Sequence, residues 1–162
     1  MTTLPPPVER ATAADFLSVA ALDRIAWPSM PETFIPDGEH AWRLWCEHAV
    51  VLISRVAETE LLPQTDEIAG ALLMFPTEAG EQFLHKIMVH PKCRGRGIGS
   101  SLMAEALKRA TTPVLLTVDP ANAAAIKLYE NFGFIVRDRI HGYYRPHEHR
   151  FVMMYDPRTG WR

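Results

Sequence analysis

A glycine-rich stretch near the middle of the chain contains the residues best suited to chemistry. It reads Arg94-Gly95-Arg96-Gly97-Ile98-Gly99 and lies between a predicted strand and a predicted helix. Glycine has no Cβ, so the backbone N–H groups of such a loop can turn toward a bound anion. The helix that follows adds unpaired amides and the positive end of its dipole. The stretch therefore predicts a site for a pyrophosphate group, to which two arginines add positive charge.

The spacing of the glycines excludes the two commonest phosphate-binding loops. A dinucleotide-binding G-x-G-x-x-G motif that starts at Gly95 needs a third glycine at the position of Ser100. A P-loop that starts at Gly95 needs Gly-Lys five and six residues later, and the chain has two serines there. The pattern that does fit is Arg-x-x-Gly-x-Gly, formed by Arg94, Gly97 and Gly99.

Two regular elements must position this loop. Residues 81–89 predict a strand, which Pro91 and the glycines stop. Because side chains alternate along a strand, one of its faces carries Glu81, Phe83, His85, Ile87 and Val89. Residues 97–110 predict a helix that follows the loop. Its buried face is expected to consist of Ile98, Leu102, Met103, Ala106 and Leu107.

The other patterns alternate between helix and strand along the chain. A capping pattern at Thr12 and Asp15 starts a helical stripe that ends at Trp27-Pro28. Further helices are predicted at 39–48 and 122–131, the second stopped by Gly133. Further strands are predicted at 50–57, 68–75, 114–118, 134–138 and 151–155. This order predicts a mixed α/β fold in a single domain, 1–162, with 1–9 as a flexible N-terminal segment.

Two signatures of the chain resemble those of the GNAT superfamily of N-acetyltransferases. The glycine-rich stretch matches the family pattern [Q/R]-x-x-G-x-[G/A]. Residues 122–134 match the second family signature, N-x-x-A-x-x-L-Y-x-x-x-G-F, with Asn122, Tyr129 and Phe134 in register. The resemblance covers about residues 50–155. Two signatures in this order and at this separation are far more specific than one glycine loop.

The resemblance implies both a fold and a coenzyme. A GNAT domain has a mostly antiparallel central sheet of six to seven strands, splayed at strands 4 and 5 and flanked by about four helices. It uses acetyl-CoA as co-substrate. By resemblance, a strand pairs with the pantetheine arm, the glycine loop holds the pyrophosphate, and Asn122 contacts the pantetheine or serves as a plain helix cap. The coenzyme-binding residues implied are Ile87, Met88, Val89, Arg94, Gly95, Arg96, Gly97, Ile98, Gly99, Ser100 and Asn122.

Acetyl transfer to an amine needs a base for the ammonium and an acid for the departing thiolate. Tyr129 matches the family's tyrosine near the coenzyme sulfur, and its place on a helical stripe also fits a core aromatic. His85 matches a position where some members carry a catalytic histidine, and a neutral imidazole can deprotonate an amine near pH 7. Glu81 on the same face is the second candidate base. Some members carry a glutamate where this chain has Thr117, so their mechanism does not carry over directly.

The acceptor amine is expected to belong to a small molecule or to a peptide N-terminus. The resemblance implies that residues 27–45 form the acceptor wall. The aromatic residues there fit either a pocket wall or core packing, and they are Trp27, Phe34, Trp42 and Trp45. Tyr143 and Tyr144 resemble paired tyrosines that contact the peptide in protein N-terminal acetyltransferases. The neighbouring histidines are of metal-ligand type, but sequence neighbours rarely converge on one ion, so we predict no metal.

Composition limits the expected binding partners and the expected cellular location of the protein. The 162 residues include 17 basic and 19 acidic side chains, a net charge of −2, which predicts neither nucleic acid nor a membrane surface as partner. Residues 1–7 contain three consecutive prolines and resemble no signal peptide. Cys46 and Cys93 are too few for a disulfide framework, so we expect reduced thiols in a cytoplasmic protein. We expect the protein to be a monomer or a homodimer. The alternative to an enzyme is a non-catalytic acyl-CoA-binding or sensor module.

Overall fold

The computed structural model describes residues 4, 6–27, 36–56, 65 and 67–159, so the expectation for Phe34 lies outside the described residues. The helices are α1 (Phe16–Ile25), α2 (Glu39–His48), α3 (Ile98–Arg109) and α4 (Ala123–Asn131). The strands are β1 (Val8–Arg10), β2 (Val50–Arg55), β3 (Ile68–Pro76), β4 (Gln82–Val89), β5 (Val114–Val118), β6 (Ile135–Ile140) and β7 (Arg150–Tyr155). The described residues also form the short 3₁₀ turns η1 (Ala13–Asp15) and η3 (Pro91–Cys93).

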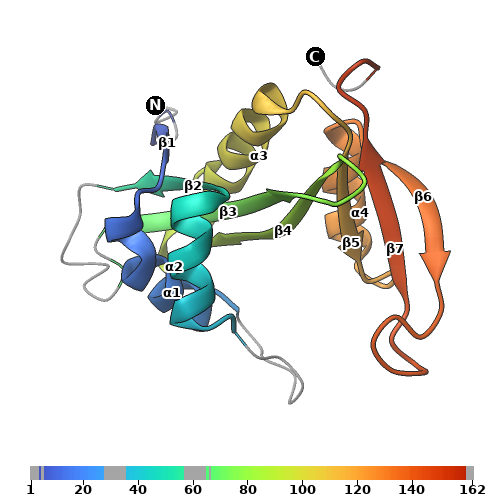
Figure 1. Ribbon diagram of the computed structural model, residues 1–162, viewed down its shortest axis with the longest axis horizontal. Coiled ribbons are helices and arrows are strands. Elements are labelled where there is room, and N and C mark those ends of the chain that lie inside the picture. Colours follow the sequence, from blue (N-terminus) through green and yellow to red (C-terminus); the bar gives the residue numbers. More distant parts are fainter. Residues whose placement is uncertain (1–3, 5, 28–35, 57–64, 66, 160–162) are drawn as a thin grey trace. The chain divides into compact units, whose positions relative to one another are not determined.

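The strands form a seven-stranded sheet in the order β1-β2-β3-β4-β5-β7-β6, which can be followed in Figure 1. The ladders β1–β2, β2–β3, β5–β7 and β6–β7 are antiparallel. The ladder between β4 and β5 is parallel and is limited to the pairs Gln82–Val114 and Phe83–Leu115. The mixed fold, the mostly antiparallel sheet and the four flanking helices predicted from the sequence are thus confirmed. Within the described residues, no helix is long and apolar enough to cross a membrane.

The chain divides into two compact units. Unit 1 consists of Met1–Phe75 and Lys86–Ala106, and it contains α1, α2, β1, β2 and most of β3 and α3. Unit 2 consists of Pro76–His85 and Leu107–Arg162, and it contains β5, α4, β6 and β7. Strand β4 belongs to both, because residues 82–85 lie in unit 2 and residues 86–89 lie in unit 1.

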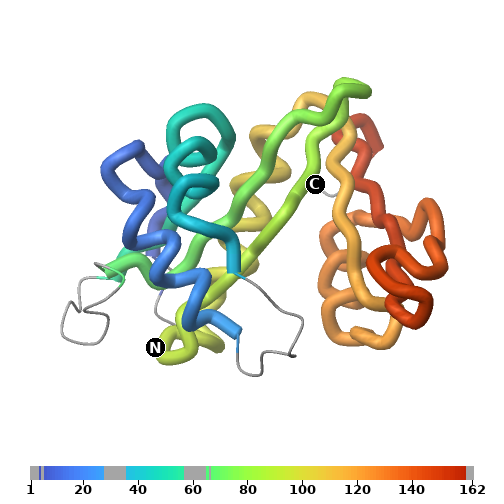
Figure 2. Tube along the Cα trace, turned by 60° about the horizontal axis from the view of Figure 1, so that its bottom comes forward, coloured from blue at the N-terminus to red at the C-terminus, as the bar shows by residue number. Residues whose placement is uncertain are grey.

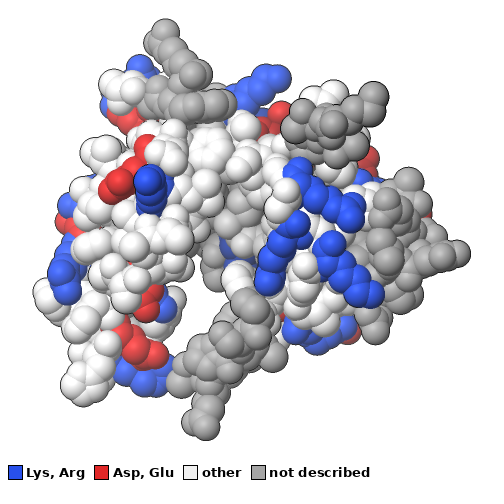
Figure 3. Space-filling view, turned by 180° about the vertical axis from the view of Figure 1, so that it is seen from behind, with Lys and Arg blue, Asp and Glu red and all other residues white. Residues whose placement is uncertain are grey.

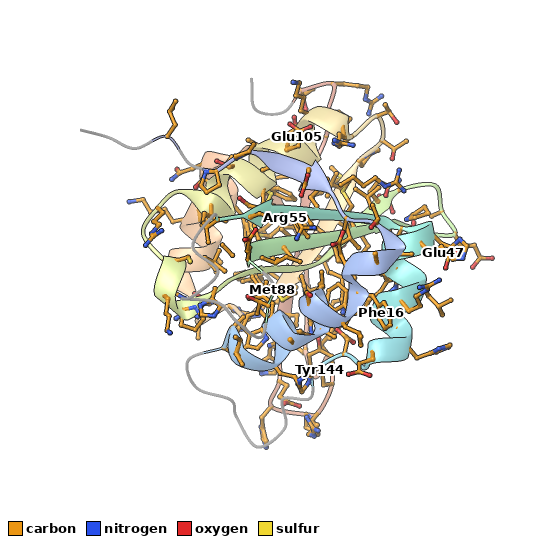
Figure 4. All side chains as sticks on the ribbon, turned by 90° about the vertical axis from the view of Figure 1, so that its left-hand side faces the viewer. Phe16, Glu47, Arg55, Met88, Glu105 and Tyr144 are labelled. Atoms are coloured by element: carbon orange, nitrogen blue, oxygen red, sulfur yellow. The ribbon has the colours of Figure 1, made fainter. Side chains whose placement is uncertain are left out.

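In unit 1, α1 and α2 lie side by side, as Figure 2 shows, and pack against strands β2 and β3. Their apolar faces and the strand residues that face them form one buried cluster. It includes Val19, Leu22, Trp42, Val51, Ile53, Ala71, Leu73 and Met88, the last labelled in Figure 4. Burial of this apolar surface is the main force that holds the helices on the strands.

Strand β1 was not predicted, because three residues are too few to show an alternating pattern. Val8 pairs with Ser54 and Arg10 with Leu52, so part of the segment expected to be flexible is a sheet edge. Arg55, labelled in Figure 4, ties this edge to the start of α1. Its guanidinium donates to Glu9 at 2.7 Å and to Asp15 at 2.6 Å. Asp15 also accepts the backbone N–H of Thr12 at 2.8 Å, as the predicted capping pattern requires.

Gly70 on β3 lets α3 approach the sheet closely. A Cβ added there would lie 2.6 Å from Cγ2 of Ile98 and 3.0 Å from Cδ1 of Leu102, both buried residues of α3. We expect Gly70→Ala to lower the free energy of unfolding by about 1–3 kcal/mol, because the buried side chains of Ile98 and Leu102, or the helix that carries them, must shift. Gly99→Ala is the control, since its Cβ meets Val89 at an ordinary 3.6 Å and alanine favours a helix. Urea denaturation measures both, and equal stabilities of the two variants would contradict the prediction.

In unit 2, the antiparallel strands β5, β7 and β6 carry a small core around Phe134. The Phe134 ring is 1% exposed and lies 5.9 Å from the ring of Tyr129 and 5.7 Å from that of Tyr155. None of the residues of α4 is fully buried, and Leu128 is 41% exposed. The helical stripe on which Tyr129 lies is therefore only partly covered.

Candidate functional site

The glycine-rich loop has the backbone geometry of an anion-binding turn. Gly95 and Gly97 adopt φ values of +78° and +77°, in the left-handed region that side-chain-bearing residues rarely enter. Helix α3 starts at Ile98, and the first intrahelical bond runs from the N–H of Ser101 to the carbonyl of Gly97 at 3.0 Å. The amides of residues 98–100 precede that bond and have no acceptor within the helix. They form the helix N-terminus expected to receive a phosphate group.

Buried residues on both sides anchor the loop while its centre stays exposed. Cys93 and Ile98 are each 1% exposed, whereas residues 94–97 are all exposed. On the face of the molecule shown in Figure 3, several Lys and Arg side chains lie close to one another. Independently of that view, three basic residues in or next to the glycine-rich loop are exposed: Lys92, Arg94 and Arg96. The positive charge expected from the sequence is therefore accessible to solvent.

His90 closes the end of β4 just before the loop. Its backbone N–H donates to the carbonyl of Ala69 at 2.7 Å, and its Nδ1 accepts the N–H of Lys92 at 3.1 Å. The second bond caps η3 and needs an imidazole with an unprotonated Nδ1. Burial lowers the pKa of His90, and the charges of Lys92 and Arg94 lower it further.

The lowered pKa of His90 predicts a loss of stability in mild acid. The folded protein binds fewer protons at His90 than the unfolded chain, whose histidine has a pKa of about 6.5. The contribution is therefore complete above about pH 6.5 and is lost as the pH falls toward the lowered folded value. In His90→Asn, the amide oxygen can still accept the backbone N–H of Lys92, and the asparagine side chain does not titrate. Urea unfolding between pH 7 and 5 should show a shallower pH dependence for this variant, and parallel curves would contradict the assignment.

Arg94, the first residue of the motif, donates a hydrogen bond from its guanidinium to the carbonyl of Ala26. Ala26 is the C-cap of α1, where helix carbonyls lack intrahelical donors. A cation at this end of the helix also interacts favourably with its dipole. In this structure the motif arginine therefore connects the glycine loop to the end of α1, a contact that the sequence did not indicate.

The three β4 residues expected to face the pantetheine differ in side-chain environment. Met88 is 3% exposed and belongs to the core under α1 and α2. Ile87 and Val89 are half-buried and alternate with it on the other face of the strand. Their backbone groups, rather than their side chains, are the atoms that the expected coenzyme contact uses.

In unit 2, Asn122 is the N-cap of α4, since its Oδ1 accepts the N–H of Ala125 at 3.2 Å. Tyr129 on the same helix is half-buried, and burial raises the pKa of its phenol. The phenol therefore stays protonated throughout the neutral range. The structure agrees with the predicted cap and with packing of the Tyr129 ring against Phe134.

The two candidate bases lie on the first half of β4 or just before it. Glu81 precedes the strand and accepts a hydrogen bond from Arg137 of β6 at 3.3 Å, so its carboxylate is part of an ion pair. His85 is an exposed residue of the strand. Thr117, where some family members have a glutamate, is half-buried on β5.

The loop between β6 and β7 presents two aromatic rings to solvent. Tyr143 and Tyr144 are 38% and 60% exposed, and their rings meet edge to face at 4.8 Å. Backbone bonds close the loop from Tyr143 N–H to the Glu148 carbonyl at 2.7 Å and from Gly142 N–H to His149 Nδ1 at 3.1 Å. Among the described residues, no three His, Cys, Asp or Glu side chains gather as a metal site would require.

The tryptophans of the expected acceptor wall differ in burial. Trp42 is 0% exposed and Trp45 packs against it edge to face at 5.1 Å, which agrees with the core-packing alternative for both. Trp27 remains half-buried at the end of α1. Both Trp27 and Trp42 donate their indole N–H to Asp23, a buried carboxylate that the sequence analysis missed. Its position on the apolar face of α1, seven residues after Phe16 and three after Ala20, could have indicated burial.

Comparison with known proteins identifies the family to which the chain belongs. A family model described as "Acetyltransferase (GNAT) family" matches residues 19–134. An uncharacterized N-acetyltransferase of Methanocaldococcus jannaschii is 38% identical over 66 residues, which cover 38% of this chain and 29% of that protein. The match therefore spans well under two thirds of that relative's length.

Solved structures share the fold of the chain. The ribosomal-protein-S18-alanine N-acetyltransferase of Escherichia coli superimposes with a TM-score of 0.73 at 20% identity, over 91% of each chain. The NatC complex bound to Gag peptide and CoA gives a TM-score of 0.71 at 20% identity, over 93% of this chain and 97% of that one. At this identity the likeness establishes the architecture. Together with the family match over more than half of the sequence, it shows that the chain belongs to the GNAT acetyltransferase family.

Proposed function

We propose that the chain transfers the acetyl group of acetyl-CoA to a primary amine by direct attack in a ternary complex. The observation that carries this proposal is the loop in which Gly95 and Gly97, both at positive φ, lead into the first amides of α3, which precede the first intrahelical hydrogen bond. A pyrophosphate on those amides meets backbone donors, the helix dipole and the charges of Arg94 and Arg96. Gly99 and Ser100 belong to the same first turn of the helix.

The pantetheine arm is proposed to extend along the end of β4. Backbone groups of residues 87–89 would pair with its amides as an added strand would. The backbone N–H of Val89 would then polarise the thioester carbonyl, which lowers the barrier to attack. Asn122 already caps α4 through its side-chain oxygen, and its amide NH₂ group keeps donor capacity for the pantetheine.

Tyr129 is the proposed general acid. Its phenol keeps its proton because burial raises its pKa, and a protonated phenol can donate that proton to the departing thiolate. His85 is the proposed base, acting directly or through water. Glu81 is the second candidate, and its carboxylate forms an ion pair with Arg137.

For the acceptor we favour a peptide N-terminus over a small amine. Tyr143 and Tyr144 form an exposed aromatic pair on a closed loop, and Arg150 lies over the Tyr144 ring at 5.0 Å. Rigid exposed aromatics of this kind offer contact area at low entropic cost. Two of the similar structures are an alanine N-acetyltransferase for a ribosomal protein and a complex with a peptide.

Release of the coenzyme thiol tests the proposal directly. The wild-type chain is incubated with acetyl-CoA and a panel of acceptors: hexapeptides with N-terminal alanine, serine or methionine, together with spermidine, tryptamine and lysine. We expect thiol release with at least one peptide and acetylation of its α-amine by mass spectrometry. Release with a small amine alone would overturn the peptide preference. Coenzyme binding without turnover of any acceptor would favour the non-catalytic acyl-CoA-binding module.

A further inference from the structure

A buried carboxylate joins four segments of unit 1. Asp23 on α1 is 0% exposed, and its two oxygens accept hydrogen bonds from four donors. The donors are Trp27 Nε1 at 3.2 Å, Trp42 Nε1 at 3.1 Å, the backbone N–H of Asp37 at 2.9 Å, and Lys86 Nζ at 2.8 Å from each oxygen. These donors satisfy an ionised group that would otherwise be very costly to bury.

Two of the donors flank the chain between α1 and α2. Trp27 is the last described residue after α1, and Asp37 lies just before α2. The same carboxylate therefore holds both ends of this connection. Lys86 of β4 reinforces the arrangement, because its Nζ also contacts Asp37 Oδ2 at 2.7 Å and lies 6.0 Å from the centre of the Trp27 ring.

The same segment is also connected to the coenzyme loop. Ala26, which accepts the guanidinium hydrogen bond of Arg94, immediately precedes Trp27. The half-buried indole of Trp27 is thus oriented through Asp23 from one side, while its backbone neighbour is bonded to the first residue of the glycine motif. The bond of the Trp27 indole to Asp23 and the bond of Arg94 to the Ala26 carbonyl thus both restrain the position of Trp27.

Stability alone is a poor explanation for such a group. Replacing a buried ion pair by apolar residues of similar volume is often neutral or stabilising, so a buried pair is weak evidence of a stabilising role. Precise orientation of a neighbouring side chain is a better explanation, because binding sites need side chains that hydrogen bonds hold in one position. Of the two indoles bound to Asp23, Trp42 is fully buried and Trp27 is partly accessible to a ligand.

We propose that Asp23 is a positioning residue for the acceptor amine, which it serves by fixing the Trp27 indole as one wall of the acceptor site. This inference rests on the proposed function. Asp23 is not catalytic. It sets how well the acceptor is held, and loss of its bond to Trp27 raises the KM for the acceptor while leaving coenzyme affinity unchanged.

The matched pair Trp27→Phe and Trp42→Phe tests the inference. Each variant removes one indole N–H bond to the same carboxylate, at 3.2 and 3.1 Å, and keeps an aromatic ring. The acceptor is the panel member that the wild type turns over fastest. We expect Trp27→Phe to raise its KM about tenfold, with the acetyl-CoA Kd within about twofold of wild type. Trp42→Phe should lower the melting temperature and leave that KM within about twofold of wild type.

A double-mutant cycle separates the role of Asp23 from that of the ring itself. Asp23→Asn should raise the acceptor KM about tenfold, and Asp23→Asn with Trp27→Phe should raise it no further, since both act through one contact. Additive effects, or an equal KM change in Trp42→Phe, would overturn the inference. If Asp23→Asn does not fold, the two tryptophan variants still decide. Failure of the wild type to acetylate any panel member would instead overturn the proposed function itself.

Discussion

Gly97→Glu is expected to abolish the thermal stabilisation that acetyl-CoA gives the wild-type chain. At about 100 times its Kd, a ligand stabilises the folded state by about 2.7 kcal/mol, which raises the melting temperature of a chain of this size by about 5–10 °C. Gly97 has φ of +77° and directly precedes the first amides of α3, which have no acceptor within the helix. A glutamate there places a carboxylate where the pyrophosphate is proposed to bind and strains the turn. Thermal unfolding with and without coenzyme measures the difference.

Gly80→Glu is the matched control for this experiment. Gly80 also has a positive φ, +86°, and a Cβ added there meets nothing within 4 Å. The substitution therefore adds the same charge and a similar backbone strain at an exposed turn that is not part of the glycine motif. The coenzyme should still raise the melting temperature of this variant by the wild-type amount. An unchanged melting curve of the wild type at millimolar coenzyme would defeat the assignment of the loop, and so would an equal rise in Gly97→Glu.

Tyr129→Phe is expected to lower kcat by about 100-fold, the smaller end of what a general acid contributes. The substitution keeps the ring that packs 5.9 Å from Phe134 and removes only the hydroxyl. Because burial raises the pKa of that hydroxyl, the wild type keeps its acid across the neutral range, and its kcat should not fall from loss of this proton below about pH 10. The Kd for acetyl-CoA should stay within about twofold of wild type.

Tyr155→Phe controls for the loss of a buried hydroxyl in the same core. The Tyr155 ring also lies near Phe134, with the two ring centres 5.7 Å apart, and Tyr155 is on β7 rather than on the signature helix. Its variant should lose stability without losing turnover. Equal kcat values for Tyr129→Phe and the wild type would assign Tyr129 to the core alone, which is the alternative that its helical spacing left open.

Local patterns in the sequence determined most of the elements and the loop between them. Helix 39–48 and strand 114–118 were predicted to the residue, and Asn122 caps the next helix as expected. The glycine motif predicted a turn at the start of α3, and Gly95 and Gly97 adopt the conformation that only glycine enters readily. These features depend on backbone preferences and on residues a few positions apart, so the sequence is sufficient to locate them.

Tertiary structure alone decided which charged side chains meet. The bond of Arg94 to Ala26 and the ion pairs of Asp23 with Lys86 and of Glu81 with Arg137 join residues far apart in the sequence. No periodicity encodes such pairings, because they depend on how the helices lie on the strands. Burial is likewise a property of the fold: an apolar stripe predicts that a face can be covered, and in α4 that face stays partly exposed. The chain thus specifies its glycine-rich turn locally, whereas long-range packing sets the partners of the side chains around it.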